Sequence, residues 1–376
     1  MSFLPKYNIS INMCNDLMKI QEATTFITQL PLPAYILKQL KHDSMVKTVI
    51  LSTKIEGNLL DETLKRKAIS KASKSSDEQE VYNLWKAIEY LEECEKKSIP
   101  ITEELIKKLH AIIQVINYGR RSKLSEYRQM QNKVGEKGIN KIVYLPPEYK
   151  DVPFLMEDLV AWINNQKNKD IPAPIKAGIF MYQFLTIHPY IDGNGRIARA
   201  LATYILRQGG FGLNGLFVLE KYYDRNLMGY YENLQMGLHH NYYFGRNEAN
   251  LTPWLDFFVH GLSEVFQDAL NIVKEKSIEF IAVEPKLIRE LDVYQREVFA
   301  QLAFKFNYIT ISDLVRLTDL ADRTVRDKVK KWIESGFIEP YDSKAQRIRA
   351  VKLTPRYQKL ANEICEQPDR YKHFLK

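Results

Sequence analysis

The chain has 376 residues, of which 45% are hydrophobic and 27% charged, as in soluble globular proteins of two or three domains. The opening residues lack the basic start and apolar run of a signal peptide, and no apolar run approaches the length of a membrane span. Three scattered cysteines without a CxxC pair argue against a disulfide framework or a zinc site. We therefore expect a cytoplasmic protein without a membrane segment.

Positive charge is concentrated near the end of the chain. The formal net charge is +8, and residues 286–376 contain 19 Lys and Arg against 13 Asp and Glu. A basic region of this kind is compatible with nucleic-acid binding, although many basic proteins bind none.

Helical periodicity dominates the first three quarters of the chain. Residues 174–187 (PIKAGIFMYQFLTI) are apolar nearly all round, which predicts a central buried helix. Residues 139–149 (INKIVYLPPEY) contain a short β-type run that ends at two prolines, as in an edge hairpin. Residues 72–79 (ASKSSDEQ) form a polar break. Amphipathic helices are expected at residues 81–93, 101–116, 152–164, 194–208 and 252–273.

The pattern changes after about Glu284. A helix-turn-helix pattern lies between Ser312 and Arg323. Helices are expected at residues 294–304, 309–319 and 321–336, followed by β-like pieces at 337–341 and 347–354. We therefore expect a mainly α protein with an N-terminal segment (1–80), a helical core (81–283) and a winged-helix-like domain (284–376).

The stretch HPYIDGNGRIARA, residues 188–200, concentrates groups suited to phosphate chemistry. Gly193 and Gly195 flank Asn194 at the expected start of a helix, which suits a turn whose backbone N–H groups face an anion. Arg196 and Arg199 are three residues apart on that helix, so both guanidinium groups can reach phosphate oxygens. The spacing predicts an anion site.

Two further residues of this stretch suit catalysis. Asp192 precedes the turn, where its carboxylate could cap the helix or bind a Mg²⁺ ion that bridges phosphates. His188 ends the buried helix because Pro189 follows it, and a histidine side chain can accept a proton from a hydroxyl near neutral pH. A buried histidine satisfied by hydrogen bonds is the alternative, which the phosphate-suited neighbours make less favoured.

This run resembles the signature of the Fic family, HxFx(D/E)GNGRxxR, with Tyr190 in place of the usual phenylalanine. The similarity extends over roughly residues 80–270. It includes the segments LSEYRQMQN, VYLPPEYKDVPFLMEDLVAWI and YYENL. The resemblance implies a Fic helical bundle with a short β-hairpin flap, to which the C-terminal winged-helix domain is added.

The resemblance also implies an activity, the transfer of AMP from ATP to a Ser, Thr or Tyr hydroxyl of a target protein and of the enzyme itself, with release of pyrophosphate. His188 would take the hydroxyl proton, and Asp192 would hold Mg²⁺. Gly193, Asn194 and Gly195 would cradle the phosphates, and Arg196 and Arg199 would contact the β- and γ-phosphates. Charge stabilisation and positioning are the main requirements of such a transfer.

Two more segments match the family. Residues 141–147 (KIVYLPP) match its flap, in which Val143, Tyr144 and Leu145 would hold the target by main-chain pairing. Residues 52–58 (STKIEGN) match its inhibitory helix, (S/T)xxxE(G/N), through Ser52, Glu56 and Gly57. The resemblance implies that Glu56 pairs with Arg199 and keeps the enzyme in a low-activity state. For residues 141–147 the plainer explanation is a structural hairpin, and for residues 52–58 it is an ordinary exposed helix.

Other assignments have alternatives. Tyr230 or Tyr231, with Tyr231 the better match, is expected to contact the adenine ring, although aromatic side chains at helical spacing are more often core residues. Arg323, Arg326 and Lys330 form a basic stripe that could meet DNA phosphates. Competing functions are a DNA-binding regulator with a nucleotide-sensing core, and a phosphodiesterase that removes AMP from protein. A homodimer is compatible with the resemblance.

Overall fold

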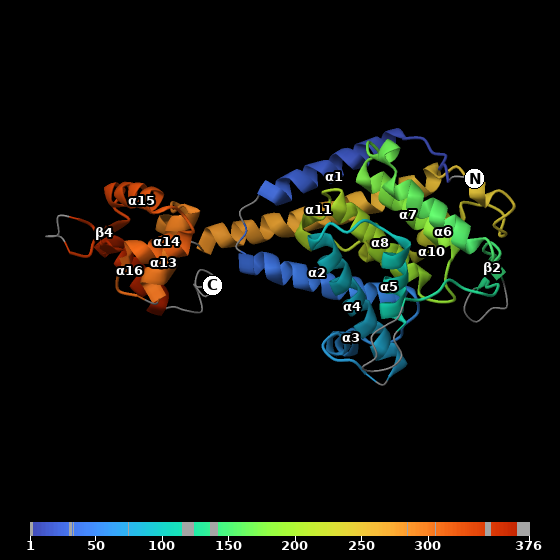
Figure 1. The fold of residues 1–376 in the computed structure, drawn as a ribbon, viewed down its shortest axis with the longest axis horizontal. Helices are drawn as coiled ribbons and strands as arrows, with labels where there is room; N and C mark the ends of the chain where they lie inside the picture. Colours follow the sequence, from blue (N-terminus) through green and yellow to red (C-terminus); the bar gives the residue numbers. More distant parts are fainter. Residues whose placement is uncertain are drawn as a thin grey trace. The chain divides into compact units, whose positions relative to one another are not determined.

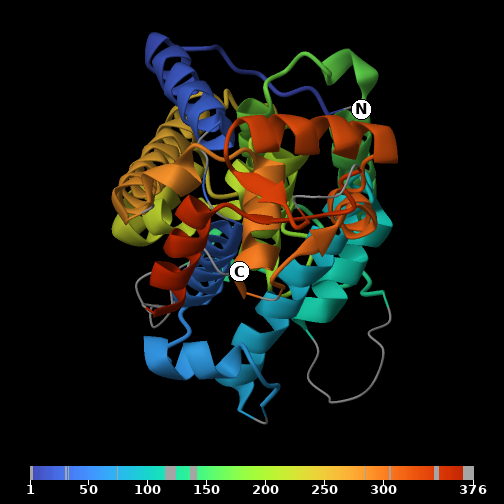
Figure 2. The ribbon, with the colours of Figure 1, turned by 90° about the vertical axis from the view of Figure 1, so that its left-hand side faces the viewer.

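The computed structural model describes residues 3–29, 32, 34–73, 75–114, 124–135, 142–283, 285–304, 306–342 and 347–366. The chain divides into two compact units, one formed by Met1–Leu30 with Leu37–Val273 and the other by Pro31–Ile36 with Lys274–Lys376. Both units are mainly helical (Figures 1 and 2). Within these described ranges, no helix combines the length and apolar character needed to cross a bilayer. The predicted mainly α fold is confirmed.

The first unit begins with three helices, α1 (Ile11–Gln29), α2 (Ala34–Ile55) and α3 (Glu62–Ala68). Helix α2 ends at Ile55, and Gly57, two residues further on, adopts a left-handed backbone (φ 90°) that glycine tolerates best. Lys65 of α3 is buried, and its Nζ donates to the carbonyl oxygens of Ile50 (3.3 Å) and Asn58 (3.2 Å). Helix α3 is thereby fixed to the end of α2.

Helices α4 to α8 and the part of α11 up to Val273 belong to the first unit (Figure 1). Twelve of the fifteen residues of α7 are buried, as the sequence predicts for a central helix. Trp254 of α11 donates to the Gly178 carbonyl of α7 (2.8 Å), which ties these two helices together. The bounds are α4 (Ser76–Lys96), α5 (Glu103–Ile113), α6 (Val152–Asn164), α7 (Ala173–Ile187), α8 (Asn194–Gln208) and α11 (Thr252–Val283).

Shorter elements complete this unit. Strands β1 (Val134–Gly135) and β2 (Ile142–Tyr144) pair in an antiparallel hairpin, which confirms the predicted β-type run. Lys141, which begins the predicted flap, lies outside the described residues. The expected polar break is shorter than predicted, because α4 begins at Ser76. The remaining helices are η1 (Gln166–Asn168), η2 (Leu213–Gly215), α9 (Glu220–Arg225), α10 (Leu227–Gln235) and η3 (Arg246–Glu248).

The second unit has the helices and strands expected from the sequence, with three additions. Residues 309–310 form strand β3 rather than the first turn of a helix, because they pair with β5 in a sheet of order β3-β5-β4. Helices α12 and α16 were not expected. The bounds are α12 (Lys286–Arg289), α13 (Val293–Phe304), β3 (Ile309–Thr310), α14 (Ile311–Thr318), α15 (Asp322–Glu334), β4 (Ile338–Pro340), β5 (Ala350–Leu353) and α16 (Pro355–Glu366). The winged-helix assignment and the three domain boundaries remain predictions.

Candidate active site

The site is built on the turn that joins the buried helix α7 to α8. His188 caps the C-terminus of α7 with a left-handed backbone (φ 52°, ψ 60°), and Gly193 caps the N-terminus of α8 in the same region (φ 83°). A left-handed backbone is unusual for a residue other than glycine and is kept only where neighbours fix it. Arg128 does so, because its backbone N–H donates to the Pro189 carbonyl (2.9 Å) and its Nε to the His188 carbonyl (3.0 Å).

The imidazole of His188 is held through Nδ1. This atom lies 3.0 Å from Nδ2 of Asn132 and 3.2 Å from Nδ2 of Asn194. Burial, together with the nearby Arg128 cation, lowers the pKa of His188 to about 4. The ring is therefore neutral near pH 7, the state in which a histidine can accept a proton.

Tyr190 anchors the loop in the core. Its side chain is 1% exposed, and its ring stacks on His110 with a centroid separation of 3.6 Å and an interplanar angle of 6°. The Tyr190 hydroxyl is buried and has no hydrogen-bond partner among the residues that the structure describes. An unpaired buried hydroxyl destabilises a fold.

Replacing Tyr190 by phenylalanine is therefore expected to stabilise the protein. Tyr190→Phe removes the unpaired hydroxyl and keeps the stacking on His110, so the free energy of unfolding should rise by about 1 kcal/mol. Urea denaturation followed by circular dichroism measures this change. A loss of stability would mean that the hydroxyl has a partner in solution.

Asp192 lies next to the turn but does not cap the helix. Gly193 is the capping residue of α8, and no side chain caps that end. Asp192 Oδ2 accepts from Gln114 Nε2 (3.0 Å) and Arg196 Nη2 (2.7 Å). Burial raises the pKa of Asp192, but the Arg196 cation and these hydrogen bonds lower it by more than burial raises it. The net pKa is below the usual value, so the carboxylate is ionised. An ionised carboxylate beside a turn that suits phosphate groups fits a Mg²⁺ ion held jointly with those phosphates.

Carboxylates already bind both arginines of the motif. Arg196 Nη1 lies 2.6 Å from Oε1 of Glu80, in addition to its contact with Asp192. Arg199 is 1% exposed, and its Nη2 lies 2.8 Å from Oε1 of Glu56. Burial lowers the pKa of Arg199, but the Glu56 carboxylate raises it more, so the guanidinium is charged. The Glu56–Arg199 pair that the resemblance implies is therefore present.

Ser52 completes this contact with α2. Arg199 Nε donates to Ser52 Oγ (3.0 Å), and Nη2 donates to the Ser52 carbonyl oxygen (3.0 Å). The spacing of four residues places Ser52 and Glu56 on the same face of α2, as the sequence predicts. This face of α2 is buried against Arg199, so the explanation of residues 52–58 as an ordinary exposed helix does not apply to it.

The Glu56 carboxylate lies directly against Gly195. A methyl group built on Gly195 would stand 2.0 Å from Glu56 Oε1 and 3.0 Å from Arg199 Nη1. Only glycine leaves room for an anionic group at this position, at the N-terminal end of α8, where backbone N–H groups favour negative charge. In this conformation a carboxylate of the chain occupies the position that suits an external anion.

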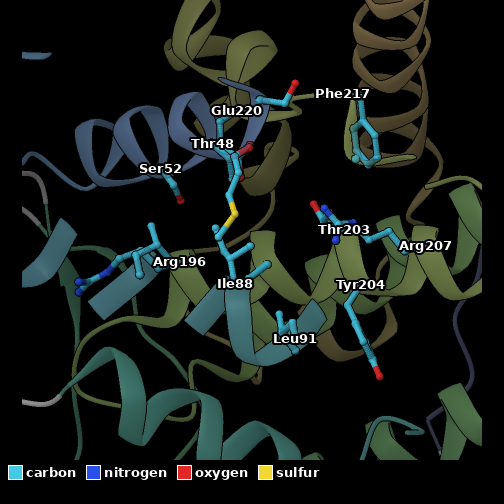
Figure 3. A pocket seen from close by; sticks show the side chains of 15 residues that line it. Thr48, Ser52, Ile88, Leu91, Arg196, Thr203, Tyr204, Arg207, Phe217 and Glu220 are labelled. Atoms are coloured by element: carbon cyan, nitrogen blue, oxygen red, sulfur yellow. The ribbon is translucent and has the colours of Figure 1, made fainter. Parts of the chain in front are cut away.

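A cavity lies behind this contact, between α2, α4 and α8 (Figure 3). Its volume is about 40 Å³, enough for one or two water molecules but too small for a nucleotide. Ser52, Arg196 and Glu220 are among its lining residues. A nucleotide at Gly195 would therefore have to bind on the other side of Glu56 or displace its side chain.

The two tyrosines proposed for the adenine ring differ in exposure. Tyr230 is 2% exposed, and its ring packs against Tyr223 (4.5 Å). It is a core residue in this conformation. Tyr231 is 44% exposed, and its hydroxyl lies 3.4 Å from the Ile55 carbonyl at the end of α2. Of the two, Tyr231 presents ring surface for a base.

The flap residues also differ from one another. Tyr144 is buried, and its hydroxyl donates to the Thr186 carbonyl of α7, so its side chain anchors the hairpin. The backbone N–H and carbonyl of Leu145 already pair with His240 (2.8 Å) and Tyr242 (3.0 Å). The β1–β2 register pairs Tyr144 and Ile142 with β1 and passes over Val143. Val143 is thus the flap residue best suited to pair with a target.

Several residues of the site were not assigned roles from the sequence. Arg128 and Asn132 lie in the segment LSEYRQMQN, which contributed only to the resemblance. His110 and Gln114 are four residues apart on and just after α5, a spacing that places both on one face toward Asp192. Such a pair is common on exposed helices, so its position in the sequence carries little signal. The sequence indicated no role for Glu80, because this residue lies at the edge of the polar break.

Comparisons with known proteins agree with this geometry. Residues 100–206 match the model of the Fic/DOC family. A curated relative, the protein adenylyltransferase Fic of Drosophila grimshawi, is 27% identical over 180 residues, which are 46% of this chain and 35% of that protein. The chain thus matches about a third of the length of that relative.

Solved structures share the fold. A Fic family protein from Desulfovibrio desulfuricans aligns over 94% of this chain and 99% of its own, with a TM-score of 0.58 and 21% identity. A Fic domain signalling protein from Bacteroides thetaiotaomicron aligns over 71% of this chain and 97% of its own, with a TM-score of 0.56 and 24% identity. The segment 100–206, which carries the motif on the turn between α7 and α8, is thus that of a Fic/DOC family domain.

Proposed function

We propose that the protein is an auto-inhibited adenylyltransferase, which transfers AMP from ATP to a hydroxyl side chain of a target protein and of itself. The observation that carries the proposal is the Glu56 carboxylate, which lies against Gly195 and binds Arg199 (2.8 Å). The Glu56 carboxylate occupies a position that suits a phosphate group. This supports a phosphate site that the chain itself blocks in its resting state. The family match and the named relative support the direction of the chemistry.

The residues of the turn would divide the work. His188, neutral near pH 7, would take the proton of the target hydroxyl, whose oxygen would attack the α-phosphorus of ATP. The bond from that phosphorus to the bridging oxygen would break, and pyrophosphate would leave. The backbone of Gly193, Asn194 and Gly195 would bind phosphate oxygens at the end of α8. Mg²⁺ beside Asp192 would supply positive charge to the phosphates.

The labelling pattern of two isotopic forms of ATP tests this function. With Mg²⁺ present, ATP labelled at the α-phosphate should label the protein or a partner covalently, whereas ATP labelled at the γ-phosphate should not. Reversible ATP binding without covalent label would favour a nucleotide-sensing regulator. Loss of label from a pre-modified protein, without new labelling, would favour the phosphodiesterase.

Main-chain pairing at Val143 is a second expectation. Val143→Pro removes the backbone N–H, so transfer to target proteins should fall about 3- to 10-fold if one hydrogen bond to the target is lost. Val143→Thr, which keeps the N–H, should transfer as the parent does. The measurement is AMP label on lysate proteins, with the fold checked by circular dichroism. An unchanged rate in a folded Val143→Pro variant would refute the docking role.

DNA binding by the second unit remains a separate prediction. Arg323 and Lys330 are exposed on α15, but Arg326 binds Asp322 of the same helix (2.6 Å). This pairing reduces the basic stripe that the sequence suggested. Duplex DNA titrated at several salt concentrations tests the prediction, because phosphate contacts give a steep dependence on salt. The homodimer also remains a prediction.

A further inference from the structure

The carboxylate of Glu80 lies between the motif and the end of α2. Its Oε1 lies 2.6 Å from Nη1 of Arg196, and its Oε2 accepts from Nδ2 of Asn58 (2.7 Å). Glu80 belongs to α4 and Arg196 to α8, whereas Asn58 follows the end of α2 and comes shortly after Glu56 in the chain. One carboxylate thus joins three segments of the first unit.

Asn58 is the residue through which the end of α2 is fixed. It is 7% exposed, and its backbone N–H donates to the Thr53 carbonyl (3.0 Å), so it closes the last turn of the helix that carries Glu56. Its Nδ2 donates to the Asp77 carbonyl (3.0 Å) as well as to Glu80, and both of these residues belong to α4. Asn58 therefore ties the last turn of α2 to the start of α4.

Glu80 also supports a second contact of Asn58. The Nζ of Lys65 donates to the Asn58 carbonyl oxygen (3.2 Å). Burial lowers the pKa of Lys65, and the Glu80 carboxylate opposes that shift. A buried ammonium group without an anion nearby is costly, so the loss of Glu80 weakens this contact too.

We propose that Glu80 is a positioning residue for the inhibitory contact, because it holds the end of α2 through Asn58 and so keeps the Glu56 carboxylate on Arg199. With this anchor in place, Glu56 leaves Arg199 by rotation of its own side chain. Without the anchor, the last turn of α2 can move as well, which gives the carboxylate a second way to leave. The inference rests on the proposed function, in which Glu56 inhibits the enzyme.

A role of Glu80 toward Arg196 alone has a different signature. Arg196 is present whether or not Glu56 is, so the loss of its partner would change AMP transfer equally in both cases. We define the inhibition factor as the transfer rate of a Glu56→Gly chain divided by the rate of the same chain with Glu56. Equal changes cancel in this ratio, so a change in the factor reports on the contact between Glu56 and Arg199.

Three substitutions, each made with and without Glu56→Gly, use this factor. Glu80→Gln leaves one acceptor oxygen for two donors, so one of its two contacts is lost. Asn58→Ala removes the side chain of the anchor, and no described contact joins Asn58 to either arginine of the motif. Glu93→Gln is the matched control, since Glu93 lies on the same helix as Glu80 and binds Lys96 at the surface.

The inhibition factor should fall about 3- to 10-fold in Glu80→Gln, which is the effect of losing about one hydrogen bond. Asn58→Ala should lower it at least as much, because both bonds from Nδ2 to α4 are lost. Glu93→Gln should leave the factor unchanged. The measurement is the initial rate of self-labelling with ATP labelled at the α-phosphate, with the fold of each variant checked by circular dichroism.

Amide hydrogen exchange of the full-length protein provides the readout that is independent of catalysis. The N–H groups of Gly57 and Asn58 bind carbonyl oxygens of the last turn of α2. In Glu80→Gln these two amides should exchange about 3- to 10-fold faster than in the parent, because local opening of this turn costs less. In Glu93→Gln they should exchange as in the parent.

The possible results separate the inference from the proposed function. An unchanged inhibition factor in either Glu80→Gln or Asn58→Ala would overturn the inference, and so would unchanged exchange in Glu80→Gln. If Glu80→Gln does not fold, the factor in Asn58→Ala decides. A Glu56→Gly chain that transfers no AMP would refute the proposed function, while the exchange rates would still decide whether Glu80 anchors α2.

Discussion

Glu56→Gly is expected to raise the rate of AMP transfer by about 10- to 100-fold, because a hydrogen bond to a charged group contributes about 1.5 to 3 kcal/mol and about 1.4 kcal/mol corresponds to a factor of ten. The change removes the carboxylate that binds Arg199 and lies against Gly195. Arg199 would then be available to a phosphate. The measurement is the initial rate of self-labelling with ATP labelled at the α-phosphate.

Two further variants control this result. Glu56→Gln keeps the volume of the side chain over Gly195 but removes its charge, so a smaller rise is expected. Glu62→Gly removes an exposed carboxylate that binds Arg66 on the surface of α3, and it should leave the rate unchanged. Unchanged or reduced transfer by a folded Glu56→Gly variant would refute the inhibitory role of α2.

The same substitution should lower stability. Arg199 is 1% exposed and keeps only its contacts with Ser52 among those described above, so loss of Glu56 leaves a buried cation with one partner fewer. The free energy of unfolding should fall by about 1 to 3 kcal/mol. A variant that is more active and less stable would fit a strained resting state.

His188→Ala is expected to lower AMP transfer by about 10²- to 10⁴-fold in the Glu56→Gly background, which is the usual contribution of a general base. Nucleotide binding should remain, because the phosphates would contact the turn and the arginines and not the imidazole. Single-turnover rates and equilibrium binding of a non-hydrolysable ATP analogue separate the two effects.

A matched control is available for His188. His260→Ala removes an imidazole that binds Asp16 and Glu264 on the surface of the first unit, so it should not affect transfer. A His188→Ala variant that labels itself as fast as its parent would defeat the assignment of the base, whatever the effect of Glu56→Gly.

The sequence predicted the helices and the motif well because both depend on local patterns. The apolar run of residues 174–187 and the glycines of the turn need no distant information, and the pairing of Glu56 with Arg199 followed from the family motif, whereas the contact of Ser52 with Arg199 was not predicted. The roles of Asn132 and Glu80 could not be predicted, because their contacts join segments far apart in the chain. The burial of Tyr230 could not be predicted either, because helical spacing cannot distinguish a core ring from a ring that faces a ligand.

The strand at residues 309–310 shows the same limit. Its sequence continues directly into α14 and reads as one helix, and the pairing of Ile309 with Val351 and of Thr310 with Ala350 makes it a strand. Thr310 then caps α14 by accepting from the Asp313 N–H (3.2 Å). Tertiary context therefore moved the helix start by two residues.

If Glu56 inhibits the protein as we propose, the ammonium group of Lys65 limits how that inhibition can be released. If α2 swung away as a rigid rod, this buried charge would lose two carbonyl acceptors in a dry environment, at a cost of about 1 to 3 kcal/mol. Rotation of the Glu56 side chain about its own bonds avoids that cost. Activation should therefore leave the backbone of α2 in place, and amide hydrogen exchange along this helix should be as slow in a fully active variant as in the native chain.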